Sequence, residues 1–438
     1  MSKDKIVVGL DIGSTKICAI VGRKDEYDKI EILGMGKAIS DGVKRGVVSN
    51  IDKTVHAITQ AIQEAEKLSG INIHVVNVGI AGQHIKSLHQ RGSITRHSTE
   101  DEISAEDVNR LINDMYKIPT PAGNQIIHVM PQDFIVDNES DIKEPVGMSG
   151  VKLEADFHII TAQTTAINNI KRCVQKAGLE IENLILEPIA SGMSVLREDE
   201  KEAGVCLVDI GGGTTDIAIF YENIIRHTAV IPFGGAIITD DIKKGCMVMQ
   251  NQAELLKIRF GKAISEEANE NEIVSIPGLR DRAPKEISVK NLAYIIEARM
   301  SEIVEEVHKE IIKSGFHNKL VGGLVISGGG ALLQGAEDLF AYMTGLEVRL
   351  GLPTEYLSKN KIELVKTPIY ATPVGLMLAG FKALDYRDDH HAISDMSPAD
   401  SLASKGTKKD NQGSDFFRRI IEKTRSLLMD DFNDKQDY

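Results

Sequence analysis

Two stretches far apart in the chain repeat one pattern. Residues 6–22 read IVVGLDIGSTKICAIVG and residues 204–220 read GVCLVDIGGGTTDIAIF. In each, an apolar β-rich run leads to Asp-Ile-Gly, a turn of small and hydroxyl residues, and a second β-rich run. This pattern predicts a tight hairpin between buried strands, with one more turn residue in the second copy. The repeat indicates two related domains, and 438 residues, 42% of them hydrophobic, can bury more than one core.

The turns of both hairpins have the composition of a phosphate-binding loop. Glycine lets the backbone approach an anion, and successive N–H groups can then line one concavity. Asp11 and Asp209 enter the two turns, where a carboxylate can hold Mg²⁺ through its waters. The candidate phosphate-binding residues are Gly13, Ser14, Thr15, Lys16, Gly211, Gly212, Gly213, Thr214 and Thr215. One such hairpin alone would be read as an ordinary Gly-rich turn capped by aspartate; the second copy favours phosphate.

Two further segments carry candidate binding residues. Residues 320–340 (LVGGLVISGGGALLQGAEDLF) predict a buried strand, a Gly-rich turn and then a helix whose N-terminus faces a ligand. The glycine spacing fits neither a Rossmann fingerprint nor a P-loop. Residues 251–263 predict a helix with Glu254 and Lys257 on one face. Taken alone, that pair favours a surface ion pair.

Composition excludes several classes of protein. A net charge of −13, without a basic patch interleaved with aromatics in the body, argues against a nucleic-acid partner. The four cysteines lie far apart, with no metal-ligand spacing, which suits buried thiols in a reducing cytosol. The N-terminus lacks a signal-peptide pattern, and no apolar run reaches the roughly 18 residues that span a bilayer. The sequence therefore predicts a cytoplasmic protein.

The C-terminal part changes character. Residues 385–414 are polar and predict a disordered linker, and residues 415–438 predict an amphipathic helix at about 100° per residue. Its apolar face suits the interface of an anionic bilayer, where basic flanks meet headgroups. The candidate membrane-binding residues are Phe416, Phe417, Arg418, Arg419, Ile420, Ile421, Leu427 and Leu428. The alternatives are a helix that docks on the body or on a partner protein.

Together these elements resemble the ATPase domain shared by actin, sugar kinases and DnaK-type chaperones. The resemblance implies an α/β, actin-like fold, in which two ribonuclease-H-like domains surround a nucleotide cleft for ATP and Mg²⁺. Residues 11–16 and 209–216 would be the phosphate loops, and residues 186–196 and 370–380 the connecting segments of an interdomain hinge. The resemblance assigns to adenosine the residues Gly328, Gly329, Gly330, Gly234, Gly235, Glu254 and Lys257. Glu187 takes the place of a water-positioning residue; the alternative is a structural Glu before Pro at a helix start.

Residues 78–85, 128–163 and 196–218 resemble the FtsA family of cell-division proteins. That resemblance implies a first actin-like domain (1–82 with 164–195), a small inserted α+β subdomain (83–163) and a second actin-like domain (196–384). It also implies a slow or uncertain ATPase whose nucleotide acts as an assembly switch, and filaments on the cytoplasmic face of the inner membrane. The expected partners are the FtsZ C-terminal peptide, further copies of the chain and later division proteins. Lys285 and Arg299 are the positions expected to meet that peptide.

Three other members of the superfamily fit the sequence less well. A pilus-assembly ATPase of the PilM type lacks the long linker and terminal helix. A metabolite kinase needs a substrate pocket and a base aimed into the cleft, and the sequence carries no such signature. A chaperone needs a β-rich substrate domain after residue 384, and too few residues follow to form one.

Overall fold

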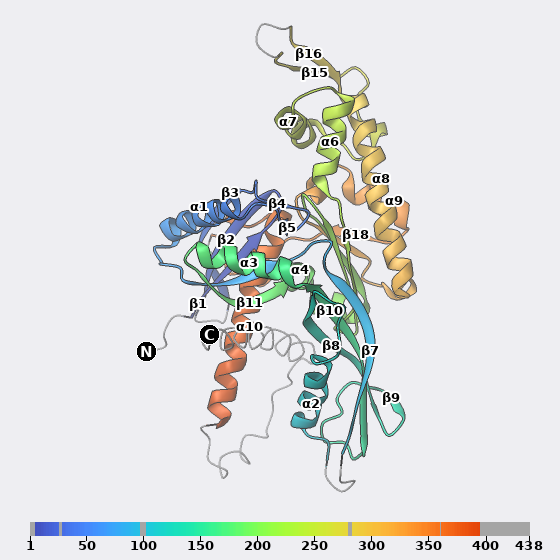
Figure 1. Cartoon of the computed structure of the whole chain (residues 1–438). Helices are drawn as coiled ribbons and strands as arrows, with labels where there is room; N and C mark the ends of the chain where they lie inside the picture. The colour runs from blue at the N-terminus through green and yellow to red at the C-terminus, as the bar shows by residue number, and fades with distance from the viewer. Residues whose placement is uncertain (1–4, 26–28, 97–101, 279–282, 360, 395–438) are drawn as a thin grey trace.

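The computed structural model describes residues 5–25, 29–96, 102–278, 283–359 and 361–394, and the side chains of 386–394 are not among them. Two five-stranded sheets of the same topology form the body (Figure 1). The first, in the order β3-β2-β1-β6-β11, consists of Ile30–Ile39 (β3), Lys16–Lys24 (β2), Ile6–Ile12 (β1), Val75–Ile80 (β6) and Glu180–Leu186 (β11). The second, in the order β14-β13-β12-β17-β18, consists of Ile224–Ile231 (β14), Thr215–Tyr221 (β13), Val205–Ile210 (β12), Leu324–Ser327 (β17) and Val348–Leu350 (β18).

The two sheets share their strand directions as well as their order. In each, three strands pair antiparallel as consecutive hairpins, and two later strands join in parallel beside the first. The predicted hairpins are the first two strands of each sheet. Their turns contain residues 13–15 and 211–214, so the extra residue of the second copy is confirmed. The internal repeat thus extends from one hairpin to a whole sheet.

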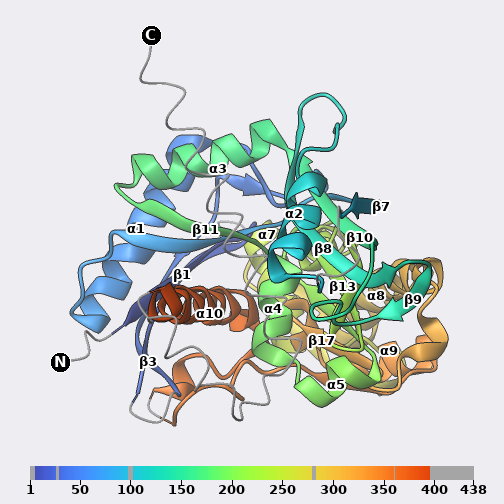
Figure 2. The ribbon, with the colours of Figure 1, turned by 90° about the horizontal axis from the view of Figure 1, so that it is seen from below.

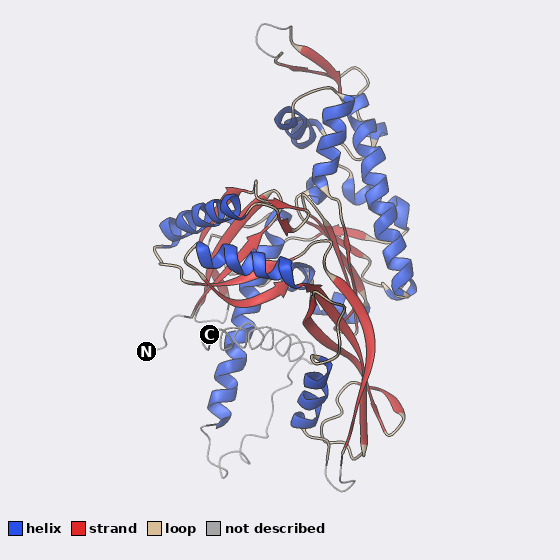
Figure 3. Ribbon diagram, viewed as in Figure 1, coloured by secondary structure: helices blue, strands red, loops and turns tan. Residues whose placement is uncertain are grey.

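Helices cover both sheets, as Figure 3 shows. Ile51–Ser69 (α1) packs on β2 and β3, and Thr164–Lys176 (α3) packs beside α1. The second sheet carries Val289–Ser314 (α8), with Ala336–Thr344 (α9) beside it. The remaining described elements in this half are Glu198–Ala203 (α5), Gly235–Gly245 (α6), Gln250–Phe260 (α7), Ile273–Ile276 (β15) and Lys285–Ser288 (β16). A short hairpin of Val43–Lys44 (β4) and Val47–Val48 (β5) precedes α1.

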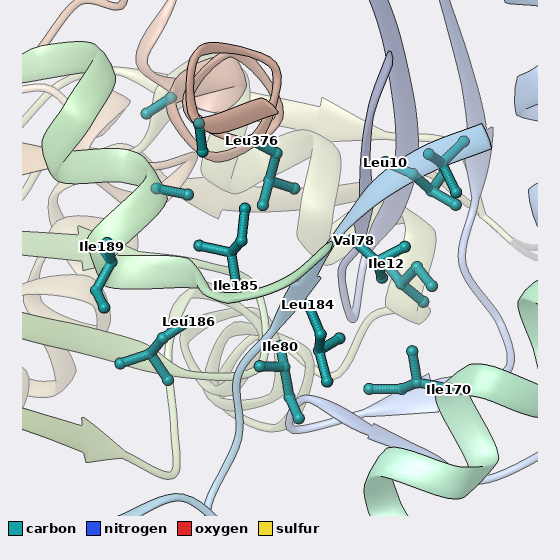
Figure 4. Close-up of a cluster of buried hydrophobic side chains, with 14 of the residues drawn as sticks. Leu10, Ile12, Val78, Ile80, Ile170, Leu184, Ile185, Leu186, Ile189 and Leu376 are labelled. Carbon is teal, nitrogen blue, oxygen red and sulfur yellow. The ribbon is translucent and has the colours of Figure 1, made fainter. Parts of the chain in front are cut away.

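Two helices lie between the sheets. Glu187–Val195 (α4) packs on β12, β13 and β17, and Ala371–Ser394 (α10) packs on β1, β2 and β6 (Figure 2). They cross in direct backbone contact, because a Cβ added to Gly375 would lie 1.8 Å from the carbonyl oxygen of Ala190. Apolar residues of β1, β6 and β11, among them Leu10 and Ile185, form one core cluster with Ile189 of α4 and Leu376 of α10 (Figure 4). The segments predicted to connect the domains thus lie between both halves.

A smaller sheet projects from the body at the end opposite α6, α7 and α8 (Figure 1). Its order β7-β10-β8-β9 consists of Lys86–Thr95 (β7), Lys152–Gln163 (β10), Asn124–Val136 (β8) and Glu139–Ile142 (β9). Ala105–Met115 (α2) packs on it, and the predicted cap at Ser104 is confirmed by a capping box with Asp107. The unit contacts β14, where Arg226 Nη1 donates to Asp133 Oδ2 at 2.6 Å.

Helix α10 corrects one expected boundary. The sequence places the start of a disordered linker at residue 385, yet the helix continues to Ser394. Asp385 is held to the first sheet, since its Oδ2 accepts a hydrogen bond from Lys24 Nζ at 2.5 Å. The expected membrane-binding residues 416–428 lie outside the described residues. Among the described ones, no helix combines the length and apolar character needed to cross a membrane.

Candidate functional site

The two hairpin turns meet face to face. A Cβ on Gly212 would lie 1.8 Å from Thr15 Oγ1, and one on Gly213 would lie 2.5 Å from Ser14 Oγ. Only glycine allows this approach. Ser14 Oγ also accepts a hydrogen bond of 3.0 Å from the Gly46 N–H, which fixes the first turn. The structure therefore brings the candidate phosphate-binding residues 13–15 and 211–214 together.

The start of α6 is built onto the second turn. The Gly235 N–H donates to the carbonyl oxygen of Gly211 at 2.9 Å, and the Ala236 N–H donates to that of Gly212 at 2.8 Å. A Cβ on Gly234 would lie 2.4 Å from the Gly211 oxygen, so the approach requires glycine there too. The N-terminus of a helix carries partial positive charge, and here it lies directly behind the turn.

Helix α7 joins the same group. Lys257 Nζ donates to the carbonyl oxygen of Gly235 at 3.0 Å and pairs with Glu254 Oε2 at 2.8 Å. The predicted helix and the surface-type ion pair are both present. The pair lies next to the Gly234–Gly235 turn. The hydroxyl of Thr239 contacts both side chains of the pair and helps to hold them there.

A lysine and a carboxylate flank the first turn. Lys16 Nζ lies 2.7 Å from Asp11 Oδ2, and the Asp11 side chain is almost fully buried. Burial disfavours the charged form of Lys16, but the nearby carboxylates, Asp11 above all, outweigh it and raise the pKa of the ammonium. Lys16 therefore stays positively charged in this group.

Asp209 connects the second hairpin to the two helices between the sheets. Its Oδ2 accepts hydrogen bonds from Ser191 Oγ of α4 at 2.6 Å and from Thr372 Oγ1 of α10 at 3.2 Å. Burial raises the pKa of Asp209, although these two hydrogen bonds oppose the shift. A change in the charge around Asp209 would thus alter hydrogen bonds to both α4 and α10.

Glu187 begins α4 at the edge of this cluster, before Pro188, as the sequence predicts. Its side chain lies over Gly79, where an added Cβ would be 2.9 Å from Glu187 Cγ. Burial first, and then the negative charges of Asp11, Asp216 and Asp209, raise the pKa of Glu187 well above its ordinary value. The raised pKa favours the protonated form of this carboxyl group.

Sequence reasoning did not single out Asp216. Its Cα pairs with that of Asp209 across the hairpin, and its Oδ2 accepts from Thr214 Oγ1 at 3.0 Å. Its Oδ1 is buried without a hydrogen-bond partner among the described residues. Burial, with the charge of Asp209, raises the pKa of Asp216 from 3.8 to about 7. The signal in the sequence was the second aspartate of DIGGGTTD, inside a strand that otherwise reads as apolar.

Asp216→Asn is expected to stabilise the ligand-free protein at pH 8 more than at pH 5. Unfolded Asp216 ionises above its ordinary value of 3.8, whereas the folded group keeps its proton up to about 7. The stability of the wild type therefore falls as the pH rises between these values. Asparagine does not ionise, so the variant does not lose this stability. The melting temperature should rise by about 2–4 °C for each kcal/mol that the variant gains in free energy of unfolding. Equal differences between variant and wild type at both pH values, in thermal unfolding, would contradict this.

The Gly-rich turn after β17 reaches the same cluster. Gly328 has φ +81°, and a Cβ on it would lie 2.4 Å from Asp209 Oδ1. Gly329 has no close neighbour, and Gly330 starts a 3-10 turn, Gly330–Leu332. The α-helix expected after the turn is present as α9, but it begins only at Ala336, beyond the 3-10 turn. The chain between them is held by Gln334, whose carbonyl accepts from the Ala263 N–H at 2.8 Å.

The carboxylate cluster suits a cation that is bound mainly by phosphate oxygens better than one that is bound mainly by protein side chains. Among the described residues, no three His, Cys, Asp or Glu side chains lie close enough together to hold a metal ion. The orphaned Asp216 oxygen and the raised pKa values of three carboxyls show that negative charge here lacks compensation. Mg²⁺ bound mainly by phosphate oxygens and water would supply it, so the residues present fit this ion.

The two expected partner-binding residues lie away from this cluster, in the unit of α6–α8, β15 and β16 (Figure 1). Arg299 is engaged within the chain: its Nε donates to Asp241 Oδ2 at 2.6 Å, and its Nη1 pairs with Glu302. Lys285 Nζ is 3.4 Å from the carbonyl oxygen of Met247, a residue whose side chain is 81% exposed. The structure does not bring Lys285 and Arg299 into one contact.

Solved structures share this fold. The chain matches a PilM–PilN type IV pilus biogenesis complex with a TM-score of 0.60 at 15% identity, over 85% of this chain and 98% of that one. It also matches the crystal structure of MreB 5 of Spiroplasma citri bound to AMPPNP with a TM-score of 0.52 at 14% identity, over 89% and 99%. At these identities the likeness shows the fold alone. It confirms the predicted actin-like fold class.

Sequence comparison is more specific. Residues 206–375 match the family model for cell division protein FtsA, and residues 82–161 match the model for the SHS2 domain inserted in FtsA. The chain is 43% identical to the cell division protein FtsA of Pseudomonas aeruginosa, over 86% of this chain and 90% of that protein. The sheet pair, the inserted unit and this identity all agree: the chain belongs to the FtsA family of cell-division proteins.

Proposed function

We propose that this chain binds ATP with Mg²⁺ between its two hairpins, assembles with further copies into filaments, and anchors the FtsZ ring to the membrane during division. The observation that carries the nucleotide site is the meeting of Gly212 and Gly213 with Thr15 and Ser14 amid the carboxylate cluster. A related fold supports it, since MreB 5 of Spiroplasma citri has a crystal structure bound to AMPPNP. Family membership supports the role in division.

Each part of the site would have a separate task in binding. The N–H groups of residues 13–15 and 212–214 would hold phosphate oxygens, with Lys16 as counter-charge. Gly329, where an added Cβ would meet only Ile369 Cγ1 at 4.0 Å, and the Glu254–Lys257 pair are the residues we assign to the base and ribose. Mg²⁺, when bound, would neutralise charge on the phosphates; Asp11 and Asp209 are the residues that would orient its waters.

Hydrolysis would be slow, with nucleotide state acting as an assembly switch. Glu187 is the residue we assign to positioning the attacking water, because its carboxyl is held among Asp11, Asp209 and Asp216. Asp209 contacts α4 and α10 through Ser191 and Thr372. Since α4 and α10 cross in backbone contact between the sheets, a change in charge at Asp209 has a route to the relative position of the two halves.

Calorimetric titration of the full-length protein with ATP tests the nucleotide site. Saturable binding that depends on Mg²⁺ is expected, and ADP should bind at the same site. A titration without measurable heat, confirmed by filter retention with labelled ATP, would reject the proposal. Weak or absent phosphate release would leave it intact, because binding rather than turnover is the switch.

The domain division stays a prediction, supported by the sheets. Segments 1–82 with 164–195, 83–163 and 196–384 each contain one complete principal sheet. We place the protein at the cytoplasmic face of the inner membrane, held there by residues 415–438. Later division proteins would bind to the assembled filament.

We expect Lys285→Glu to weaken binding of the FtsZ C-terminal peptide about tenfold, the equivalent of about 1.4 kcal/mol. Lys285 combines a positive charge with the exposed apolar side chain of Met247, a surface suited to an amphipathic peptide. Arg299 is a weaker candidate, because Asp241 and Glu302 already pair with it. Fluorescence anisotropy with a labelled peptide measures this, with Lys309→Glu as the charge-matched control. An equal loss in the control would refute a specific site.

A further inference from the structure

A hollow of about 470 Å³ lies next to α10, on the face of that helix that points away from α4. It is lined by Lys29, Thr354, Leu357, Ser358, Lys359, Ile362 and Lys366. Three of these seven residues are lysines and none is acidic, in a chain whose net charge is −13. The volume is within the range of small-ligand pockets, and the charge selects for an anion.

The floor of the hollow is fixed by the fold. Leu357 is buried in a cluster with Val374, Leu378 and Phe381 of α10, and Ile362 packs against it. The Ser358 N–H donates to the carbonyl oxygen of Ile30 at 2.8 Å, which attaches the segment to the start of β3. The rim lysines therefore stand on a rigid support, although their own side chains are exposed.

Two groups in the hollow, the Ser358 hydroxyl and the Lys366 ammonium, can serve a ligand. The Ser358 hydroxyl oxygen is buried without a hydrogen-bond partner among the described residues. A buried hydroxyl without a partner is uncommon and calls for a ligand or water. Within the described part of the chain, Lys366 forms an ion pair with Glu363, an exposed side chain 3.3 Å away. An anion with several acceptor oxygens would satisfy both the hydroxyl and the ammonium groups.

The hollow is near the point where the chain leaves the body toward its C-terminus. Lys29 immediately precedes β3, and Ile30 of β3 pairs with Lys24 of β2. Lys24 in turn binds Asp385, in the last part of α10. The hollow is thus linked, through Lys24, to the C-terminal half of α10.

We propose that the lysine hollow, formed by Lys29, Lys359, Lys366 and Ser358, binds a phosphate group, and that this phosphate belongs to an anionic lipid headgroup. Lysine is a common partner of phosphate as a point charge, and the Ser358 hydroxyl adds a directional donor. The apolar floor of Leu357 and Ile362 tolerates the glycerol carbons next to a headgroup phosphate. The inference rests on the proposed membrane function and adds a second contact, in the folded body, to the one made by the tail.

The test compares four full-length proteins in flotation with vesicles of phosphatidylglycerol and phosphatidylcholine. They are wild type, the triple variant Lys29→Gln/Lys359→Gln/Lys366→Gln, the charge-matched control Lys244→Gln/Lys309→Gln/Lys313→Gln, and Ser358→Ala. The triple variant is expected to bind anionic vesicles more weakly by about fivefold per lysine, and Ser358→Ala to lose less. The control should bind like wild type. Equal binding by the triple variant and the control would overturn the proposal.

A second arm separates the two sources of phosphate. Thermal unfolding is followed with added inorganic phosphate, against chloride at equal ionic strength. Phosphate should stabilise wild type and control more than the triple variant, which keeps only the hairpin site, and the stabilisation should shrink in Ser358→Ala. Loss of this stabilisation with unchanged vesicle binding would assign the hollow to a soluble phosphate and overturn the lipid assignment. A 1–414 truncation that floats like the full chain would instead refute the membrane role of the tail, independently of the hollow.

Discussion

Asp209→Ala is expected to abolish retention of Mg-ATP. Asp209 lies within the second hairpin, and its Oδ1 would be 2.4 Å from a Cβ on Gly328. Its Oδ2 meanwhile holds Ser191 of α4 and Thr372 of α10. Alanine removes the negative charge that would orient the ion's waters and also both of these hydrogen bonds. A loss of about ten- to a hundredfold in affinity follows if the metal waters depend on this carboxylate.

Asp209→Asn separates charge from structure. Asparagine keeps an acceptor oxygen for Ser191 and Thr372, so it should fold like wild type and still lose most of the affinity. Asp114→Asn makes the same chemical change on the exposed surface of α2 and should bind ATP normally. Calorimetry with Mg-ATP and thermal unfolding of each variant are the measurements. Unchanged affinity in a folded Asp209→Asn protein would remove Asp209 from the metal site.

Local sequence patterns predicted the parts of the site that depend on neighbouring residues. The hairpin turns, the extra residue at 211–214, the cap at Ser104 and the Glu254–Lys257 pair all follow from composition within one element. The pattern of each hairpin also indicated a buried pair of strands. These features need no knowledge of what packs against them.

Other features depend on contacts between distant segments. Asp216 acquires its raised pKa from burial opposite Asp209, which follows only from the register of β12 and β13. The contact of Gly375 with Ala190 joins residues far apart in the chain, and the local sequence around Gly375 does not predict it. Helix α10 continues past residue 385, where Lys24 of β2 and Lys5, just before β1, pair with Asp385. Tertiary contacts decide all three.

Removing residues 415–438 is expected to abolish membrane binding. The segment carries apolar residues at helical spacing with basic flanks, and the described part of the body has no membrane-spanning helix. Burying each large apolar side chain contributes roughly 1.5–3 kcal/mol as an upper figure, which the cost of ordering the helix reduces. One tail should therefore bind weakly, and a filament would gather many tails and raise the avidity.

A milder variant, Leu427→Glu/Leu428→Glu in the full chain, places two charges on the apolar face and keeps the length. It should lose binding almost as completely as the truncation. Leu68→Glu/Leu255→Glu changes two exposed leucines of α1 and α7 in the same way and is the matched control. A pronounced loss in the control would point to a general charge effect in place of a membrane helix.

The most direct test of the whole account is flotation of the full-length protein and of a 1–414 truncation with anionic liposomes, each with and without Mg-ATP. The account predicts that only the full-length protein floats, and that it floats more with Mg-ATP, because nucleotide-driven assembly multiplies the tails. If neither protein floats, or both float equally, the tail is not the anchor. If the full-length protein floats equally with and without Mg-ATP, nucleotide does not control assembly on the membrane.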